Sequence, residues 1–140
     1  LSAKGSKLTQ SMAVKLSKES GLILLCGRYE GIDQRVIDYN NFEEISIGDY
    51  VLPGGESAAI VLLESVLRLL PNVLGGENTL DEESFNNEML LEYPHYTKPK
   101  EWKGIHVPEI LVSGDHKKIQ TWRNEKRLEI TKKKRPDLIN

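Results

Sequence analysis

The chain has 140 residues, of which 39% are hydrophobic and 29% charged, a composition that suits one folded domain or a domain with a small appendage. This disfavours fibrous, collagen-like and disordered proteins. The apolar runs at residues 22–26 and 60–63 are far shorter than the roughly 20 residues that cross a bilayer. One cysteine, Cys26, cannot form an internal disulfide, and no signal sequence is recognisable, so we expect a cytoplasmic protein.

The net charge of −2 conceals an uneven distribution along the chain. Residues 1–97 carry 7 basic and 15 acidic side chains, whereas residues 98–140 carry 12 basic and 6 acidic ones. The first part therefore has a formal charge of −8 and the second of +6. The basic part suits contact with a polyanion, although charge alone fits a solvated basic helix equally well.

The first elements are predicted from apolar spacing. Leu8, Met12 and Leu16 recur four apart, which predicts an amphipathic helix over residues 6–19. The continuous apolar run at 22–26 is typical of a buried parallel strand.

Three more elements complete an α/β order. Residues 32–38 predict a short helix, and the alternation over 43–47 predicts a second strand. Residues 56–70 are rich in Ala, Leu and Val and precede Pro71, which predicts a helix that stops there and is buried against the sheet or another subunit. We expect an α/β domain with glycine loops at the ends of its strands.

The remaining residues predict a second, basic unit. Residues 73–92 lack periodicity and predict a flexible linker, and the two prolines within 93–99 exclude a helix there. A last helix is expected to begin near Ser113 or Asp115, either of which can cap it. Its predicted apolar stripe contains Ile119 and Trp122, and its predicted exposed face carries Lys117, Lys118, Arg123, Lys126 and Arg127.

Two glycine-rich loops, residues 27–31 and 48–55, are candidates for ligand binding. Neither has the GxGxxG spacing of a dinucleotide fingerprint, and the chain has no GxxxxGK[ST] phosphate loop. Such loops can present backbone N–H and C=O groups to a small ligand with polar edges, such as an adenine ring. Tight turns without a ligand remain the alternative.

Three blocks of sequence resemble one known family. They are CGRYEGIDQR at 26–35, SIGDYVLPGGE at 46–56 and YPHYTKP at 93–99, with a shorter match, SGDH, at 113–116. Their residues, order and spacing resemble the bacterial tRNA (guanine-N1)-methyltransferases of the TrmD family, in the knotted SPOUT class. The resemblance covers nearly the whole chain.

The resemblance implies a two-domain architecture. Residues 1–72 would form an α/β SPOUT-type methyltransferase domain with a deep trefoil knot, and residues 73–92 the linker. Residues 93–140 would form a small, basic, largely α-helical domain that binds tRNA. Relative to the family, the chain is expected to lack an N-terminal portion and to stop within the C-terminal helices.

The activity implied is methylation of N1 of the guanosine immediately 3′ of the anticodon, with S-adenosylmethionine as methyl donor. The family forms homodimers with the active site at the subunit interface, and neither DNA nor a membrane is an expected partner. Two alternatives remain open: a SPOUT methyltransferase for another RNA position, and a non-enzymatic RNA-binding α/β module.

The resemblance also assigns residues to the cofactor. In the first loop Ala3 follows the matching serine, where family members have a proline. The implied cofactor-binding residues lie in three loops and are Ser2, Gly27, Tyr29, Glu30, Ile47, Gly48, Asp49, Tyr50, Val51, Leu52, Gly54 and Gly55.

Methylation at N1 requires a base for the N1 proton and a cation or donor beside O6. By resemblance the cation is Arg68 and the base is Glu83, where the family usually has aspartate. Asp81 or Glu82 takes the role if the register of the linker differs. From the residues alone, a solvated acidic linker and an ordinary charge at a helix end would be the preferred explanations of these groups. No metal ligands are expected, and the sequence does not say whether Mg²⁺ assists.

Overall fold

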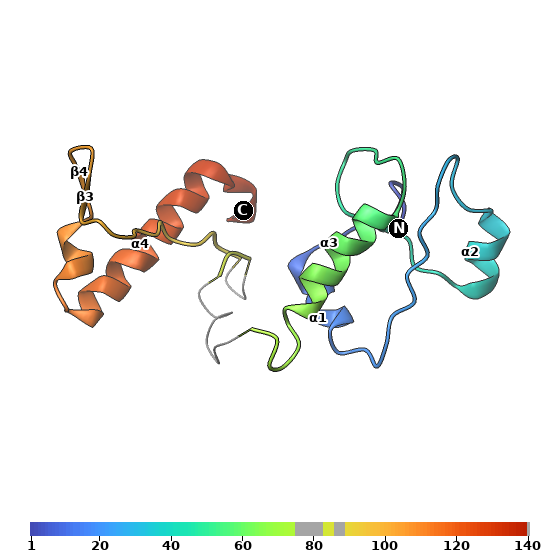
Figure 1. Cartoon of the computed structure of the whole chain (residues 1–140), viewed down its shortest axis with the longest axis horizontal. Coiled ribbons are helices and arrows are strands. Elements are labelled where there is room, and N and C mark those ends of the chain that lie inside the picture. Colours follow the sequence, from blue (N-terminus) through green and yellow to red (C-terminus); the bar gives the residue numbers. More distant parts are fainter. Residues whose placement is uncertain (75–82, 86–88, 140) are drawn as a thin grey trace. The chain divides into compact units, whose positions relative to one another are not determined.

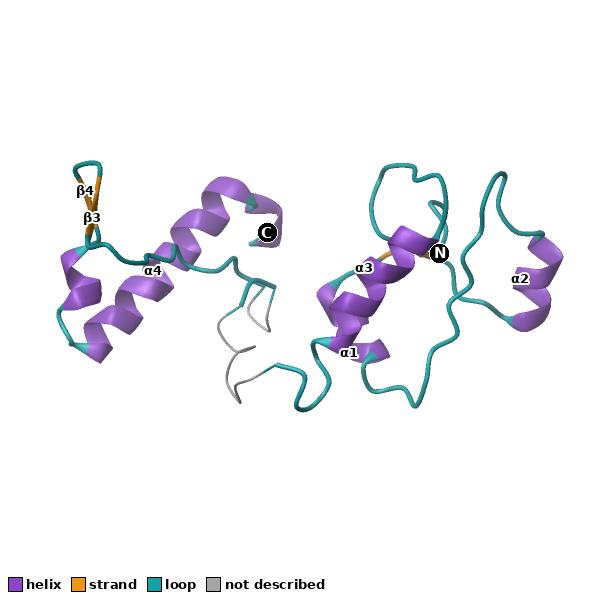
Figure 2. Cartoon of the chain, in the orientation of Figure 1, coloured by secondary structure: helices purple, strands orange, loops and turns teal. Residues whose placement is uncertain are grey.

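The computed structural model describes all residues except 75–82, 86–88 and 140 (Figure 1). The chain divides into two compact units, Leu1–Gly76 and Glu77–Asn140. The described residues form four α-helices and two small two-stranded sheets, so the protein is α/β as predicted (Figure 2). Within the described part of the chain, no helix is long and apolar enough to span a membrane. The predicted linker lies largely outside the described residues.

The first unit is built around one parallel strand pair. In chain order its elements are β1 (Ser6–Lys7), α1 (Gln10–Leu16), α2 (Gln34–Asn40), β2 (Ile45–Ser46) and α3 (Glu56–Leu67). The first residues of the helix predicted over 6–19 form β1 instead, with Ser6 opposite Ile45. The helix begins after Thr9, whose hydroxyl accepts the Met12 N–H at 3.2 Å.

The core of this unit lies between α1 and α3. Ala13 and Leu62 are almost completely buried, together with Ile45 and Val66. The predicted apolar face of the first helix is confirmed, because its members pack against this core; they are Leu8, Met12 and Leu16.

The strand predicted at residues 22–26 is wrong. None of these residues belongs to a strand, and Ile23 is 86% exposed. A strand needs a neighbour that pairs the N–H and C=O groups of successive residues. The apolar character of the run does bury part of it, since Leu22 and Leu24 pack against the core. The apolar run therefore correctly indicated contact with the core, but it did not show whether a neighbouring strand would form hydrogen bonds with it.

Helix α3 follows the second glycine loop directly, with Gly55 as its N-cap and Arg68 as its C-cap. Its position confirms the helix predicted over 56–70, which ends slightly earlier. Burial is confined to one face, because Ile60 and Val61 are exposed. Burial within the chain confirms the prediction for one face of the helix, and burial of the other face against another subunit stays a prediction; the buried residues are Ala58, Ala59, Leu62 and Val66.

The second unit consists of a hairpin followed by a long helix. Its elements are β3 (Glu101–Trp102), β4 (Ile105–His106), the 3-10 helix η1 (Glu109–Val112), α4 (His116–Lys134) and the 3-10 helix η2 (Pro136–Leu138). Asp115 caps α4 by accepting the Lys118 N–H at 3.1 Å, which confirms the predicted start. Thr131 is completely buried; its hydroxyl donates to the Arg127 carbonyl at 2.7 Å and accepts the Leu91 N–H at 2.9 Å.

Two arginines of α4 are not on the exposed face predicted for them. Arg127 is only 7% exposed, and the Arg123 guanidinium lies 4.6 Å from the centre of the Tyr93 ring. Both follow the half-buried Ile119 at intervals of four residues, so they continue the inward ridge of the helix. Their long aliphatic stems can pack there like apolar side chains, which a count of charges does not reveal.

Candidate functional site: a cavity between three loops

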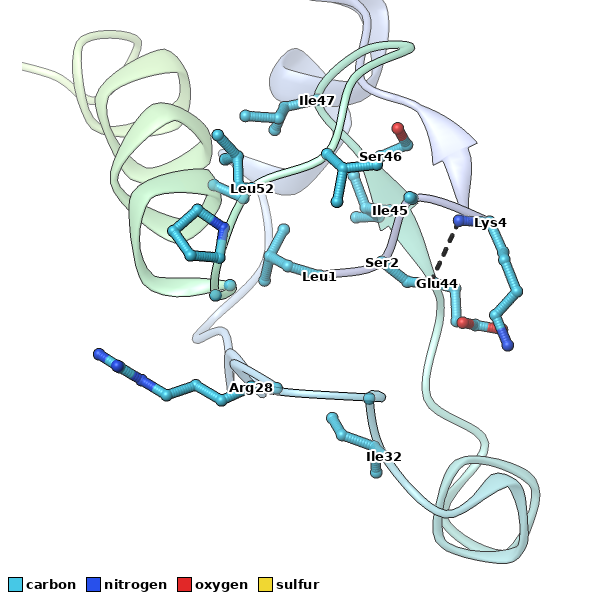
Figure 3. Close-up of a pocket in the computed structure, with 18 of the residues that line it drawn as sticks. Leu1, Ser2, Lys4, Arg28, Ile32, Glu44, Ile45, Ser46, Ile47 and Leu52 are labelled. Atoms are coloured by element: carbon cyan, nitrogen blue, oxygen red, sulfur yellow. Dashed lines mark hydrogen bonds between the residues drawn. The ribbon is translucent and has the colours of Figure 1, made fainter.

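A cavity of about 280 Å³ lies in the first unit (Figure 3). It is lined by the segment around Ser2, by the loop 27–31 and by the loop 47–55, which are far apart in sequence. Eleven of the twelve predicted cofactor residues line it: Ser2, Gly27, Tyr29, Glu30, Ile47, Gly48, Tyr50, Val51, Leu52, Gly54 and Gly55. The twelfth, Asp49, is not part of the lining; its carboxylate lies 3.3 Å from the Lys7 ammonium.

The first loop is held against β2 by backbone hydrogen bonds. The Ser2 N–H donates to the Ile45 carbonyl at 2.9 Å, and the Ser2 hydroxyl accepts the Lys4 N–H at 3.2 Å (Figure 3). The loop therefore turns around Ala3, the position at which the resembled family has proline.

The second and third loops are joined to each other. The Gly55 N–H donates to the Gly27 carbonyl at 2.9 Å, and Arg28 and Gly54 form an isolated antiparallel bridge. A β-carbon at Gly55 would lie 2.9 Å from Cys26 Cα, closer than real β-carbons approach another atom. This position therefore requires glycine because the backbone segments pass so close together.

An ion pair reinforces the same junction. Arg28 Nε donates to Glu56 Oε1 at 2.7 Å, and both side chains are largely exposed. The hydrogen bond from Arg28 holds the pKa of the Glu56 carboxyl below its ordinary value. The pair links the second loop to the first turn of α3, and Arg28 also lines the cavity.

The third loop turns at Gly48. The buried Ser46 hydroxyl lies 3.1 Å from the Gly48 carbonyl and 3.2 Å from its N–H, and the Tyr50 N–H donates to that carbonyl at 3.0 Å. Gly48 has a φ of +153°, which L-residues rarely adopt, and a β-carbon there would lie 2.5 Å from the Tyr50 ring. The turn brings backbone groups to the wall of the cavity without an intervening side chain.

The cavity combines two kinds of wall. Ile47 and Leu52 supply apolar surface, and the glycines of both loops bring backbone to the wall without side chains. Of these backbone groups, the Gly27 carbonyl, the Gly55 N–H and both groups of Gly48 already take part in hydrogen bonds within the chain. Tyr29, whose φ is +57°, and Tyr50 are both exposed. This combination suits a flat ring with hydrogen-bonding edges, because few polar groups within an apolar wall fix the orientation of a ligand.

Neither predicted catalytic residue lines this cavity. Arg68 is half-buried at the C-terminal end of α3 in the first unit, and Glu83 is half-buried in the second unit. The alternative bases Asp81 and Glu82 lie outside the described residues. The catalytic roles of all four therefore stay predictions.

Arg28 and Glu56 are not among the residues predicted to form the site, although both lie within the recognised blocks. Arg28 follows Gly27 and Glu56 follows Gly55, so each charge stands beside a glycine of a predicted ligand loop. Two opposite charges in these positions could have predicted the ion pair between the loops. Nowhere in the described residues do three His, Cys, Asp or Glu side chains gather in a way that could hold a metal ion.

Comparison with known proteins identifies similar chains. The sequence pattern of the family described as tRNA (Guanine-1)-methyltransferase TrmD matches residues 1–140. A tRNA (guanine-N(1)-)-methyltransferase of Pelagibacter ubique is 56% identical over 138 residues, which is 99% of this chain and 60% of the relative. The proteins of the same name from Clostridioides difficile and Caldicellulosiruptor saccharolyticus are 54% and 56% identical over 99% and 100% of this chain. The chain spans 59% and 56% of those two relatives.

Proposed function

Since the chain belongs to the TrmD family of tRNA (guanine-1)-methyltransferases, we propose that it acts in methyl transfer from S-adenosylmethionine to tRNA. The methylated atom is N1 of the guanosine immediately 3′ of the anticodon. The observation that carries the proposal is the family match over the whole chain, together with one cavity lined by eleven of the residues expected to hold the cofactor.

The cavity is the proposed cofactor site. The glycine loops offer backbone N–H and C=O groups to the adenine edge, while Ile47 and Leu52 offer apolar surface to its faces. S-adenosylmethionine supplies an electrophilic methyl group on a positively charged sulfur. The deep trefoil knot and the homodimer with an active site between subunits belong to this proposal as well.

The proposed chemistry assigns two roles to charged side chains. The Glu83 carboxylate takes the proton from guanine N1, so that the ring nitrogen becomes nucleophilic. The Arg68 guanidinium donates to O6, where negative charge grows as that proton leaves. In the homodimer the two side chains act on ligands held by different subunits.

The test is Glu83→Gln in the full-length enzyme. We expect nearly normal S-adenosylmethionine binding by calorimetry and a single-turnover methylation rate lower by about 100-fold or more, the usual contribution of a general base. Glu109→Gln, which removes an exposed carboxylate from the same unit, serves as the control and should methylate at the wild-type rate.

Two other results would change the proposal. An undiminished rate in Glu83→Gln moves the base to Asp81 or Glu82, each of which can be replaced in the same way. If the wild-type protein binds no S-adenosylmethionine, a non-enzymatic RNA-binding module explains the chain better. Mapping the methylated nucleotide distinguishes the anticodon-adjacent guanosine from other RNA positions.

A further inference from the structure

The hairpin of β3 and β4 exposes an apolar face. In its register Trp102 lies opposite Ile105, and Glu101 lies opposite His106. Because residues directly opposite each other share a face, the two apolar side chains lie on one face and the two polar ones on the other. Trp102 is 60% exposed and Ile105 is 65% exposed, so neither is covered by its own unit.

The backbone presents this face in a defined way. The two turn residues, Lys103 and Gly104, have φ values of +51° and +77°, the combination of a tight two-residue hairpin turn. The Val107 N–H donates to the Lys100 carbonyl at 2.9 Å, which extends the pairing toward η1. The hairpin projects away from α4 (Figure 1).

The segment around the hairpin is basic. Every residue from 95 to 106 is exposed, and this stretch contains three lysines and one glutamate. The Lys103 ammonium lies 4.9 Å from the centre of the Trp102 ring, over one of its faces. A large aromatic surface is therefore exposed beside several positive charges.

We propose that this hairpin is an RNA-contacting finger, on which an unpaired base of the tRNA stacks against Trp102 while Lys100 and Lys103 contact neighbouring phosphates. This inference rests on the proposed function, because the RNA is the substrate of that reaction. Aromatic side chains stack on bases of any identity, and lysines beside them attract the backbone.

Two other occupants of this surface are less favourable than an unpaired base: a protein partner and a base paired within a helix. Lysine is depleted from the cores of protein–protein interfaces, whereas it is common in surfaces that bind nucleic acid. A paired base already stacks on its neighbours within the helix, so an exposed indole has most to gain from a base in a loop or bulge.

The experiment measures RNA binding by the full-length enzyme carrying Trp102→Ala. Two probes are used: a stem–loop with the sequence of a tRNA anticodon arm, and a fully paired RNA duplex of equal length. We expect the Kd for the stem–loop to rise by about tenfold, within the range seen when a stacking aromatic is truncated. The Kd for the duplex should change by less than about twofold, because a paired base is not free to stack on the indole.

Two controls separate stacking from general damage. Trp102→Phe keeps an aromatic ring and should retain most of the stem–loop affinity. Tyr39→Ala removes an exposed aromatic from α2 in the other unit and should leave both affinities unchanged. S-adenosylmethionine binding and the melting temperature are measured for each variant to confirm that the fold is intact.

Three outcomes would overturn the inference. If the wild type methylates tRNA and Trp102→Ala binds the stem–loop as tightly as the wild type does, the hairpin does not contact an unpaired base. The proposed function is then unaffected. Equal weakening of the stem–loop and duplex complexes would mean that stacking on an unpaired base is not involved. A change of oligomeric state in sedimentation would identify the hairpin as a protein interface. By contrast, a wild-type enzyme that neither binds nor methylates tRNA refutes the proposed function itself.

Discussion

Replacing Gly55 with alanine tests whether the close approach of two loops shapes the cavity proposed to bind the cofactor. The new β-carbon would lie 2.9 Å from Cys26 Cα and 3.2 Å from the Gly27 nitrogen. Carbon atoms prefer separations of about 3.5–4.0 Å, so the two segments must separate by roughly 0.5–1 Å. The backbone itself allows alanine, because φ at this residue is −78°.

The expected cost follows from that displacement. Overpacking a tight contact usually costs about 1–3 kcal/mol. The same movement stretches the hydrogen bond from the Gly55 N–H to the Gly27 carbonyl, whose net contribution is about 0.5–1.5 kcal/mol. We therefore expect the free energy of unfolding to fall by about 1–3 kcal/mol. The Kd for S-adenosylmethionine should rise by about tenfold, equivalent to about 1.4 kcal/mol.

Calorimetric titration of the full-length protein with S-adenosylmethionine, together with urea unfolding, measures both effects. Gly21→Ala is the matched control, because a β-carbon at that position meets nothing within 4 Å. It should bind the cofactor normally and be as stable as the wild type, or more stable by about 0.4–1 kcal/mol. If Gly55→Ala binds the cofactor as tightly as Gly21→Ala does, the contact between the loops does not shape the site.

Three further changes test other contacts. Thr131→Val should lower the free energy of unfolding by about 1–3 kcal/mol in urea titrations, since it leaves the Leu91 N–H without its acceptor; Thr131→Ser, which keeps the hydroxyl, should lose less. Glu56→Gln should weaken cofactor binding with little loss of stability, because its ion pair with Arg28 is exposed. Because Arg28 lowers the pKa of Glu56 from 4.5, the ion pair is intact above pH 4.5 and is lost as the pH falls through the lowered pKa. The cofactor affinity of the wild type should therefore decline over that acidic range. The affinity of Glu56→Gln, which lacks the carboxylate, should not show this decline. Replacing the three lysines that end α4 with glutamate should weaken tRNA binding and flatten its dependence on salt, and an unchanged Kd would refute this role of Lys132, Lys133 and Lys134.

Elements with local signals were predictable from sequence. The start of α4 follows from the capping side chain of Asp115, and α3 follows from an apolar helical run between Gly55 and Pro71. In each case the residues that decide the structure are neighbours in the chain. A local signal of this kind needs no knowledge of the fold.

Elements that depend on distant pairing were predicted less well, although β2 does lie within the strand predicted over 43–47. The run at 22–26 has the composition of a buried strand, but no neighbouring strand among the described residues forms backbone hydrogen bonds with it. Composition alone does not reveal whether such a neighbour exists. Conversely, β1 lies within a predicted helix, because Ser6 pairs with Ile45 across a large separation in sequence. A preference for a helix or a strand is overridden when tertiary contacts offer the backbone another partner.

The candidate site shows the same division. The resemblance supplied the glycine loops, and most of the residues assigned from it line one cavity. The link between Arg28 and Glu56 became visible only in three dimensions, because their separation of 28 residues is closed by the fold. Motif matching identifies residues that a family shares, whereas contacts between the motifs must be read from the structure.

The charge distribution changes meaning once the basic residues are placed. The sequence suggested one basic face on the last helix, but Arg123 and Arg127 turn inward and contribute their stems to packing. Lys126 lies against the Glu129 carboxylate at 2.5 Å, which raises the pKa of the lysine. The exposed positive charge of the second unit is therefore found in three places: the β3–β4 hairpin, the first turn of α4 with Lys117 and Lys118, and the last turn of α4. A polyanion is positioned by the arrangement of charges and not by their sum. The proposed tRNA would therefore respond to these three clusters and not to the total of +6.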